Sequence, residues 1–333
     1  MITNEETGEL AGWLATEGAG IHWSEDPGPS ALAGRLAARF GGGDGGGDGF
    51  TGRAVVAQEP PELVVPLSVP ADEPAVQAAE FRRLADAIRA VLGEATFLGT
   101  HGFGAPYGRR TDPRWGRPFL RWRLGGTTLE LRAGAAGPEL VLQPSASWED
   151  WYQSVGRGVT GTRESSGVEL DHPRHEGPTN WEDLELTFAA FLRSLPAVTT
   201  ALGVPLNLGL YGRIAGSGAP LLFGIVSDTR LYVDFTEYEV GEAARGERAA
   251  ALGWTPREAL SPGHRAPEFD GGSPWWVDAG GPGEVDAGAV ASLIVRTARA
   301  AGVAAATDVV LGGEAEFRYP FRFAFPSLSI PVG

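Results

Sequence analysis

The stretch FLRWRLGGTTLELR, residues 119–132, decides the fold class. Apolar and polar residues alternate on both sides of Gly125 and Gly126, which is the period of a strand with one buried face. Two adjacent glycines supply the positive φ angles of a two-residue turn. The stretch therefore predicts an antiparallel β-hairpin.

The two faces of this hairpin differ in chemistry. Leu120, Trp122 and Leu124 share one face, which we expect to pack in the core. Arg121 and Arg123 lie on the opposite face, which we expect to be solvated or to contact a partner. These two arginines are therefore candidate binding residues.

The other elements of the first half follow from the same periodicities. Apolar residues at steps of three and four predict helices, and prolines beside short apolar runs place extended segments at a sheet edge. The Gly/Asp-rich loop 41–49 is expected to be flexible because glycine runs lose much entropy on ordering. The expected elements are helices around residues 10–14, 32–40 and 81–92, edge strands at 54–56 and 63–67, and a further strand at 139–143.

A stretch without apolar periodicity, residues 157–180, separates the two halves. We expect an N-terminal α+β domain over residues 1–165, a linker at 166–178, and a second α+β domain over 179–333 with an extended C-terminal tail. Each half contains a helix, an antiparallel meander and a further helix. A diverged duplication is therefore one interpretation.

A long helix opens the second half. Apolar residues from Trp181 to Leu202 follow one helical face, after a capping box formed by Thr179 and Glu182. Pro196 is expected to kink or split this helix. Three strands and two later helices are expected after it, at residues 206–210, 220–226, 231–235, 240–252 and 290–301.

Composition narrows the classes of partner. The chain has 27 basic and 42 acidic residues, a net charge of −15, which repels nucleic acid and anionic lipid and favours a partner protein with a basic surface. It contains no cysteine, which excludes disulfides and thiolate metal sites. No stretch approaches the roughly 18 apolar residues of a membrane helix, so we expect a cytoplasmic protein without membrane insertion.

The only histidine cluster, at residues 171–176, is a weak catalytic candidate. His172 and His175, with Asp171 or Glu176, are the residue types that bind a metal in a hydrolase. Pro173 forbids the helix that would bring both histidines to one face. We therefore expect no catalytic residue, metal ligand or cofactor, and keep a metal-dependent hydrolase as an alternative.

Two aromatic groups are candidate partner contacts. Trp275 and Trp276 lie in a Gly/Pro-rich stretch that predicts a loop, where tryptophan often anchors an interface. Phe321 and Phe323 alternate with arginine in the tail, as in an edge strand that pairs with another chain. Packing is the alternative for the tryptophans, and a homodimer through the C-terminal strand, with a structural role, is the alternative for the tail.

Four motifs in the second half carry a family resemblance. They are WEDL at residues 181–184, LYVDF at 231–235, LGWTP at 252–256, and the helix at 290–297. Over residues 179–312 the chain resembles actinobacterial members of the YbjN-like group, which is similar in fold to type III secretion chaperones. Asp234 stands where that group usually has a glutamine.

The first half has a weaker resemblance, through residues 115–129, to small uncharacterised actinobacterial domains suspected of belonging to toxin-immunity or secretion loci. Together the two resemblances imply a non-enzymatic helper that binds another protein. The expected function is thus a cytoplasmic, chaperone-like or immunity-like protein-binding module.

Overall fold

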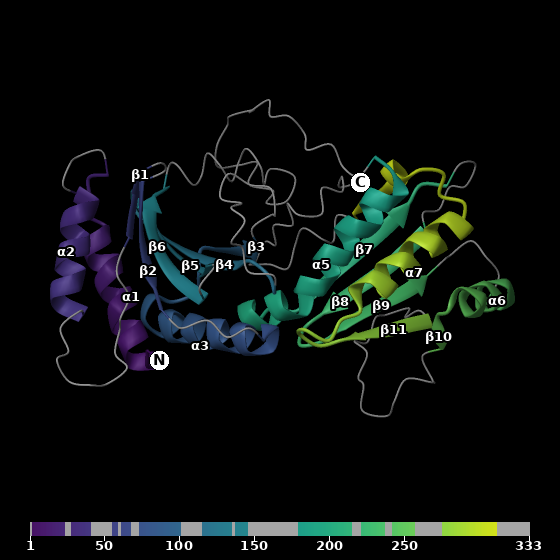
Figure 1. Cartoon of the computed structure of the whole chain (residues 1–333), viewed down its shortest axis with the longest axis horizontal. Coiled ribbons are helices and arrows are strands. Elements are labelled where there is room, and N and C mark those ends of the chain that lie inside the picture. The colour runs from purple at the N-terminus through teal and green to yellow at the C-terminus, as the bar shows by residue number, and fades with distance from the viewer. Residues whose placement is uncertain are drawn as a thin grey trace.

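The computed structural model describes residues 2–23, 28–40, 55–58, 61–67, 73–100, 115–134, 137–145, 179–214, 221–236, 242–256 and 275–311. Two antiparallel six-stranded sheets, each packed against helices, build this part of the chain (Figure 1). The α+β class predicted from the sequence is confirmed.

The predicted hairpin lies inside the first sheet, sheet A. Leu124 pairs with Thr127 across Gly125 and Gly126, and Gly125 has a φ of 74°. The spatial order of strands in sheet A is β1 (Val55–Gln58), β2 (Pro61–Pro66), β6 (Gly137–Pro144), β5 (Thr127–Gly134), β4 (Pro118–Leu124) and β3 (Phe97–Thr100).

One expectation about the edge of sheet A is wrong. The run at 63–67 was expected at a sheet edge, but β2 lies between β1 and β6. Pro61 and Pro66 occupy the first and last positions of β2, where a missing N–H interrupts the ladder least. The strand can therefore be internal despite its prolines.

Helices α1 (Asn4–Gly18), α2 (Gly28–Phe40) and α3 (Pro74–Leu92) pack against sheet A. As predicted, α3 ends at Gly93, whose φ of 78° favours glycine. Phe81 and Ile88 of α3 are fully buried in the same core cluster as Leu120 of β4. The apolar face of the hairpin is thus a core face, as expected.

The second sheet, sheet B, contains the expected three-stranded meander, β7–β8–β9. Three further strands, β10, β11 and β12, which the sequence did not predict, complete sheet B. The spatial order is β10 (Thr255–Pro256), β11 (Trp275–Gly280), β9 (Leu231–Thr236), β8 (Leu221–Ser227), β7 (Leu206–Gly212) and β12 (Val309–Leu311).

The loop predicted for Trp275 and Trp276 is wrong, because both residues begin β11. This strand pairs with β9 through Trp276 and Asp234. The two partners are far apart in the chain, so local Gly/Pro content does not reveal the pairing.

Helices α5 (Trp181–Leu202), α6 (Glu242–Leu252) and α7 (Ala287–Ala300) belong to the second half. Asn180, and not Thr179, caps α5, since its side chain accepts a hydrogen bond of 2.9 Å from the backbone N–H of Asp183. The helix continues through Pro196 without being split. The hydroxyl of Thr199 donates to the Leu195 carbonyl at 3.0 Å, beside the proline.

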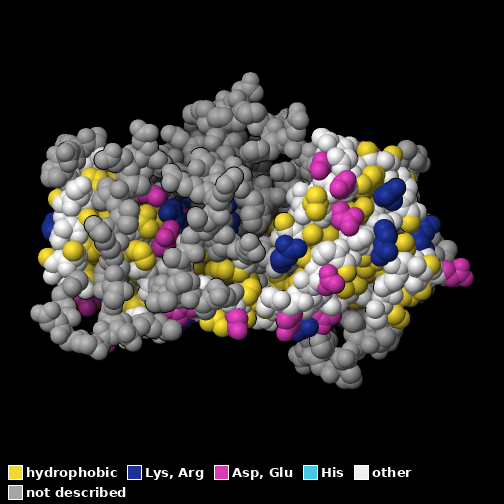
Figure 2. All heavy atoms as spheres, in the orientation of Figure 1, with side chains coloured by type: hydrophobic (Ala, Val, Ile, Leu, Met, Phe, Trp, Pro, Cys, Tyr) yellow, Lys and Arg dark blue, Asp and Glu magenta, His cyan; other side chains and the backbone are white. Residues whose placement is uncertain are grey.

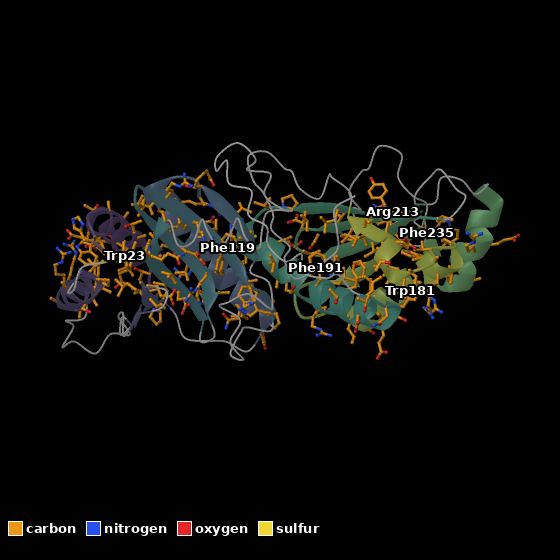
Figure 3. The ribbon with its side chains drawn as sticks, turned by 90° about the horizontal axis from the view of Figure 1, so that it is seen from above. Trp23, Phe119, Trp181, Phe191, Arg213 and Phe235 are labelled. Atoms are coloured by element: carbon orange, nitrogen blue, oxygen red, sulfur yellow. The ribbon has the colours of Figure 1, made fainter. Side chains whose placement is uncertain are left out.

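Helix α5 joins the two halves. It contacts α3, β3 and β4 of the first half and α7, β8 and β9 of the second. From Phe191 to Leu202 it is buried nearly all round, as expected for a helix enclosed on both sides. Figure 3 shows Phe191 between the two sheets. The guanidinium of Arg89 on α3 donates to the carbonyl of Leu202 at 3.1 Å, and both sheets share one hydrophobic core cluster.

Candidate binding surfaces

Sheet A has a second face, opposite to the side that packs in the core. Strand alternation places charged and polar side chains there, and cross-strand pairing aligns them. We call this surface the polar face of sheet A. Its members include Glu62, Val64, Phe119, Arg121, Arg123, Thr128, Glu130, Arg132, Glu139, Val141 and Gln143.

An ion pair between Arg121 and Glu130 occupies the centre of this face. The two residues are directly opposite in register, and the Nε of Arg121 donates to the Glu130 carboxylate. Their side chains are 1% and 0% exposed. Gln143 donates to the same carboxylate at 3.2 Å, and the guanidinium of Arg121 lies 4.4 Å from the Phe119 ring centroid.

Arg121 is therefore buried and not solvated, whereas contact of this face with a partner stays a prediction. A buried charge needs a partner because its desolvation costs several kcal/mol. Glu130 provides that partner from the neighbouring strand. The ion pair thus adds an electrostatic contact between β4 and β5. The exposed arginine of this strand is Arg123, whose backbone N–H donates to the Thr96 hydroxyl at 3.1 Å.

A second charge group surrounds Arg132. Its Nε donates to Glu139 at 2.7 Å and its Nη1 to Glu62 at 3.2 Å. Burial lowers the pKa of Arg132, but the charges of Glu139, Glu130 and Glu62 more than offset this, so its pKa is raised. Burial raises the pKa of Glu139 despite the opposing charge of Arg132.

The corresponding face of sheet B, the aromatic face, is built around a tryptophan and a tyrosine. Trp276 is 0% exposed and packs with Val226 and Tyr232, the two rings meeting edge to face at 6.5 Å. Beside them Asp234 accepts a hydrogen bond of 2.7 Å from the Gly224 backbone N–H. A Cβ at Gly224 would lie 2.7 Å from that carboxylate, so Asp234 requires glycine opposite.

An ion pair closes one end of this aromatic face. Arg230 donates to Asp278 at 3.0 Å, and this hydrogen bond raises the pKa of Arg230. Burial, followed by the charge of Asp278, raises the pKa of Tyr232. These groups fix β9 to β11 next to the bulge between Asp278 and Gly280.

The first turns of α5 present a third surface, the α5 patch, consisting of Glu182, Asp183 and Leu186. Both acidic residues are exposed. Leu186 is 64% exposed, more than the other exposed large hydrophobics of the described residues, Val76 and Val91. Figure 2 shows acidic and apolar side chains next to one another over α5 and α7.

The predicted contact residues are distributed over different environments. Arg121 and Trp276 are buried, Trp275 is half-buried against the core, and Arg123 is exposed. Phe321 and Phe323, the linker 166–178, the loop 41–49 and the cluster with His172 and His175 lie outside the described residues. The role of these residues in binding stays a prediction.

Glu130 was missed as the partner of Arg121, although the sequence holds the signal. A two-residue turn at Gly125 and Gly126 fixes the register of the hairpin, and this register places residue 130 opposite residue 121. Glu62 carries no comparable local signal, because its partner Arg132 lies 70 residues away in the chain.

No protein-family model matches the chain, and searches of curated proteins and of solved structures find no match. Across the described ranges, no helix has the length and apolar character needed to cross a membrane. In the same ranges, no group of three or more His, Asp or Glu side chains is placed to hold a metal ion. Function is therefore inferred from the surfaces above.

Proposed function

We propose that this chain is a non-enzymatic, cytoplasmic protein-binding module, chaperone-like or immunity-like, whose partner presents a basic surface. The α5 patch carries this proposal. It combines the most exposed large hydrophobic side chain of the described part with two exposed carboxylates. An apolar contact bordered by charge is typical of a protein interface.

Two further features support the proposal. The net charge of −15 favours a basic partner through long-range attraction. Many arginines of the described part are already paired with carboxylates, among them Arg35 with Glu17 and Arg39 with Glu9. The resemblance of residues 179–312 to the YbjN-like group is in keeping with a chaperone-like role.

The test is affinity capture from the host with the tagged full-length chain, followed by titration of the captured protein. We expect Glu182→Lys combined with Leu186→Ser to weaken binding by about tenfold or more, which corresponds to 1.4 kcal/mol. Glu247→Lys combined with Val76→Ser, on other exposed helix positions, is the matched control. Equal affinities for both double variants, or no captured partner, would contradict the proposal.

A further inference from the structure

Three carboxylates act on one another around Arg132 on the polar face of sheet A. Glu139 of β6 lies directly opposite Arg132 of β5. Glu62 of β2 also reaches the Arg132 guanidinium, at 3.2 and 3.4 Å. Glu130 adds a third negative charge from β5. One guanidinium is therefore shared between two carboxylates, while the third pairs with Arg121.

Packing holds the Glu139 carboxylate in this position. A Cβ added to Gly134 would lie 2.5 Å from the Glu139 carboxyl carbon, so the group is pressed against the backbone of β5. The side chains of Glu139 and Glu62 are 17% and 13% exposed. Water therefore screens the repulsion between them only weakly.

We propose that Glu139, with Glu62, Glu130 and Arg132, forms a proton-binding clamp that holds β2, β6 and β5 together more firmly in acid than at neutral pH. Like charges in a buried site disfavour the simultaneous ionisation of all carboxylates. Protonation of Glu139 removes this repulsion. Arg132 then keeps Glu62 as its charged partner, and the protonated Glu139 can still accept a hydrogen bond.

The direction of the pH effect follows from proton linkage. Burial first, and then the charges of Glu62 and Glu130, raise the pKa of Glu139 above its ordinary value of 4.5, against the attraction of Arg132. The folded chain then binds more protons than the unfolded chain, so this contribution is complete below about pH 4.5 and is lost as pH rises through the raised pKa. Among the described residues, Arg132, Glu62 and Glu130 are the charged groups that act on Glu139.

The test is denaturant unfolding of the full-length chain between pH 4 and 8. At each pH, the folding equilibrium constant of the wild type is divided by that of Glu139→Gln. From pH 4 to pH 8 this ratio should fall, by about tenfold for each unit by which folding raises the pKa of Glu139. Glu62→Gln should move this fall to lower pH, because one repelling charge is removed. Glu94→Gln, at a carboxylate 67% exposed, is the control and should parallel wild type.

Parallel pH profiles for wild type and Glu139→Gln would overturn the proposal. A second readout covers the case in which Glu139→Gln does not fold. Carbon-13 NMR of the Glu139 carboxyl in the wild-type chain should show a titration midpoint above 4.5. A midpoint at or below this value would also overturn the proposal.

Discussion

Sheets A and B have the same spatial plan but are built in a different chain order. In each, a three-stranded meander lies at the centre, with two further strands on one side and a single strand on the other. In each, one helix connects the flanking pair to the single strand, α3 between β2 and β3, and α7 between β11 and β12. The meander follows this unit in sheet A and precedes it in sheet B.

The two halves are thus related as circular permutations of one strand arrangement. This agrees with, but does not test, the interpretation of a diverged duplication. Packing thus selects the spatial order of the strands. The order of the strands along the chain can vary as long as neighbouring strands remain antiparallel. Circular permutation is generally tolerated at exposed connections between elements.

The second faces of the sheets differ more than their topologies. Sheet A fills this face with ion pairs, of which Arg121 with Glu130 is the most buried. Sheet B places Trp276 and Tyr232 there, together with the Asp234 carboxylate, which a backbone N–H holds, and with Asp278, which pairs with Arg230 at one end. Buried ion pairs demand partners in fixed positions, whereas aromatic packing depends on shape and area.

The largest expected effect comes from breaking the central ion pair of sheet A. Arg121→Ala should lower the free energy of unfolding by about 3–5 kcal/mol, because Glu130 would remain charged and buried. Urea unfolding measures this effect. Arg123→Ala, at the exposed position of the same strand, should cost much less, within about 1 kcal/mol. A loss below 1 kcal/mol for Arg121→Ala would show that Glu130 is not dependent on this partner.

A smaller effect is expected at the carboxylate of sheet B. Gly224→Ala should destabilise the chain by about 1–3 kcal/mol, since the new methyl group meets the Asp234 carboxylate. Thermal unfolding provides the measurement. Gly126→Ala, where a Cβ meets nothing within 4 Å, is the matched control. If the double variant Gly224→Ala, Asp234→Ala were no more stable than Gly224→Ala, a contact other than the one with Asp234 would cause the loss of stability.

The smallest effect concerns the helix that joins the two sheets. Asn180→Ala should cost about 1 kcal/mol by removing the N-cap hydrogen bond to Asp183. Thr179→Ala should have little effect on the unfolding midpoint. The reverse ranking would restore the capping box predicted from the sequence.

Local patterns were sufficient for elements whose partners are close in the chain. The hairpin at Gly125 and Gly126, the helix ending at Gly93 and the meander β7–β9 were all predicted, since strand and helix periods report which side of a segment is buried. The same hairpin register contained the pairing of Arg121 with Glu130. Of the candidate site, this pair was therefore accessible to sequence reasoning.

Only the tertiary structure decided the partners of segments that lie far apart in the chain. It placed Trp276 in an internal strand, brought Glu62 to the guanidinium of Arg132, and enclosed α5 between two sheets. These arrangements depend on contacts between distant residues, whose favourable energy is gained only when the whole sheet assembles. The sequence alone determined which faces of the elements are apolar and where the chain turns. The tertiary structure decided which residues each face contacts, because period and turn signals carry no information about neighbours that are distant in the chain.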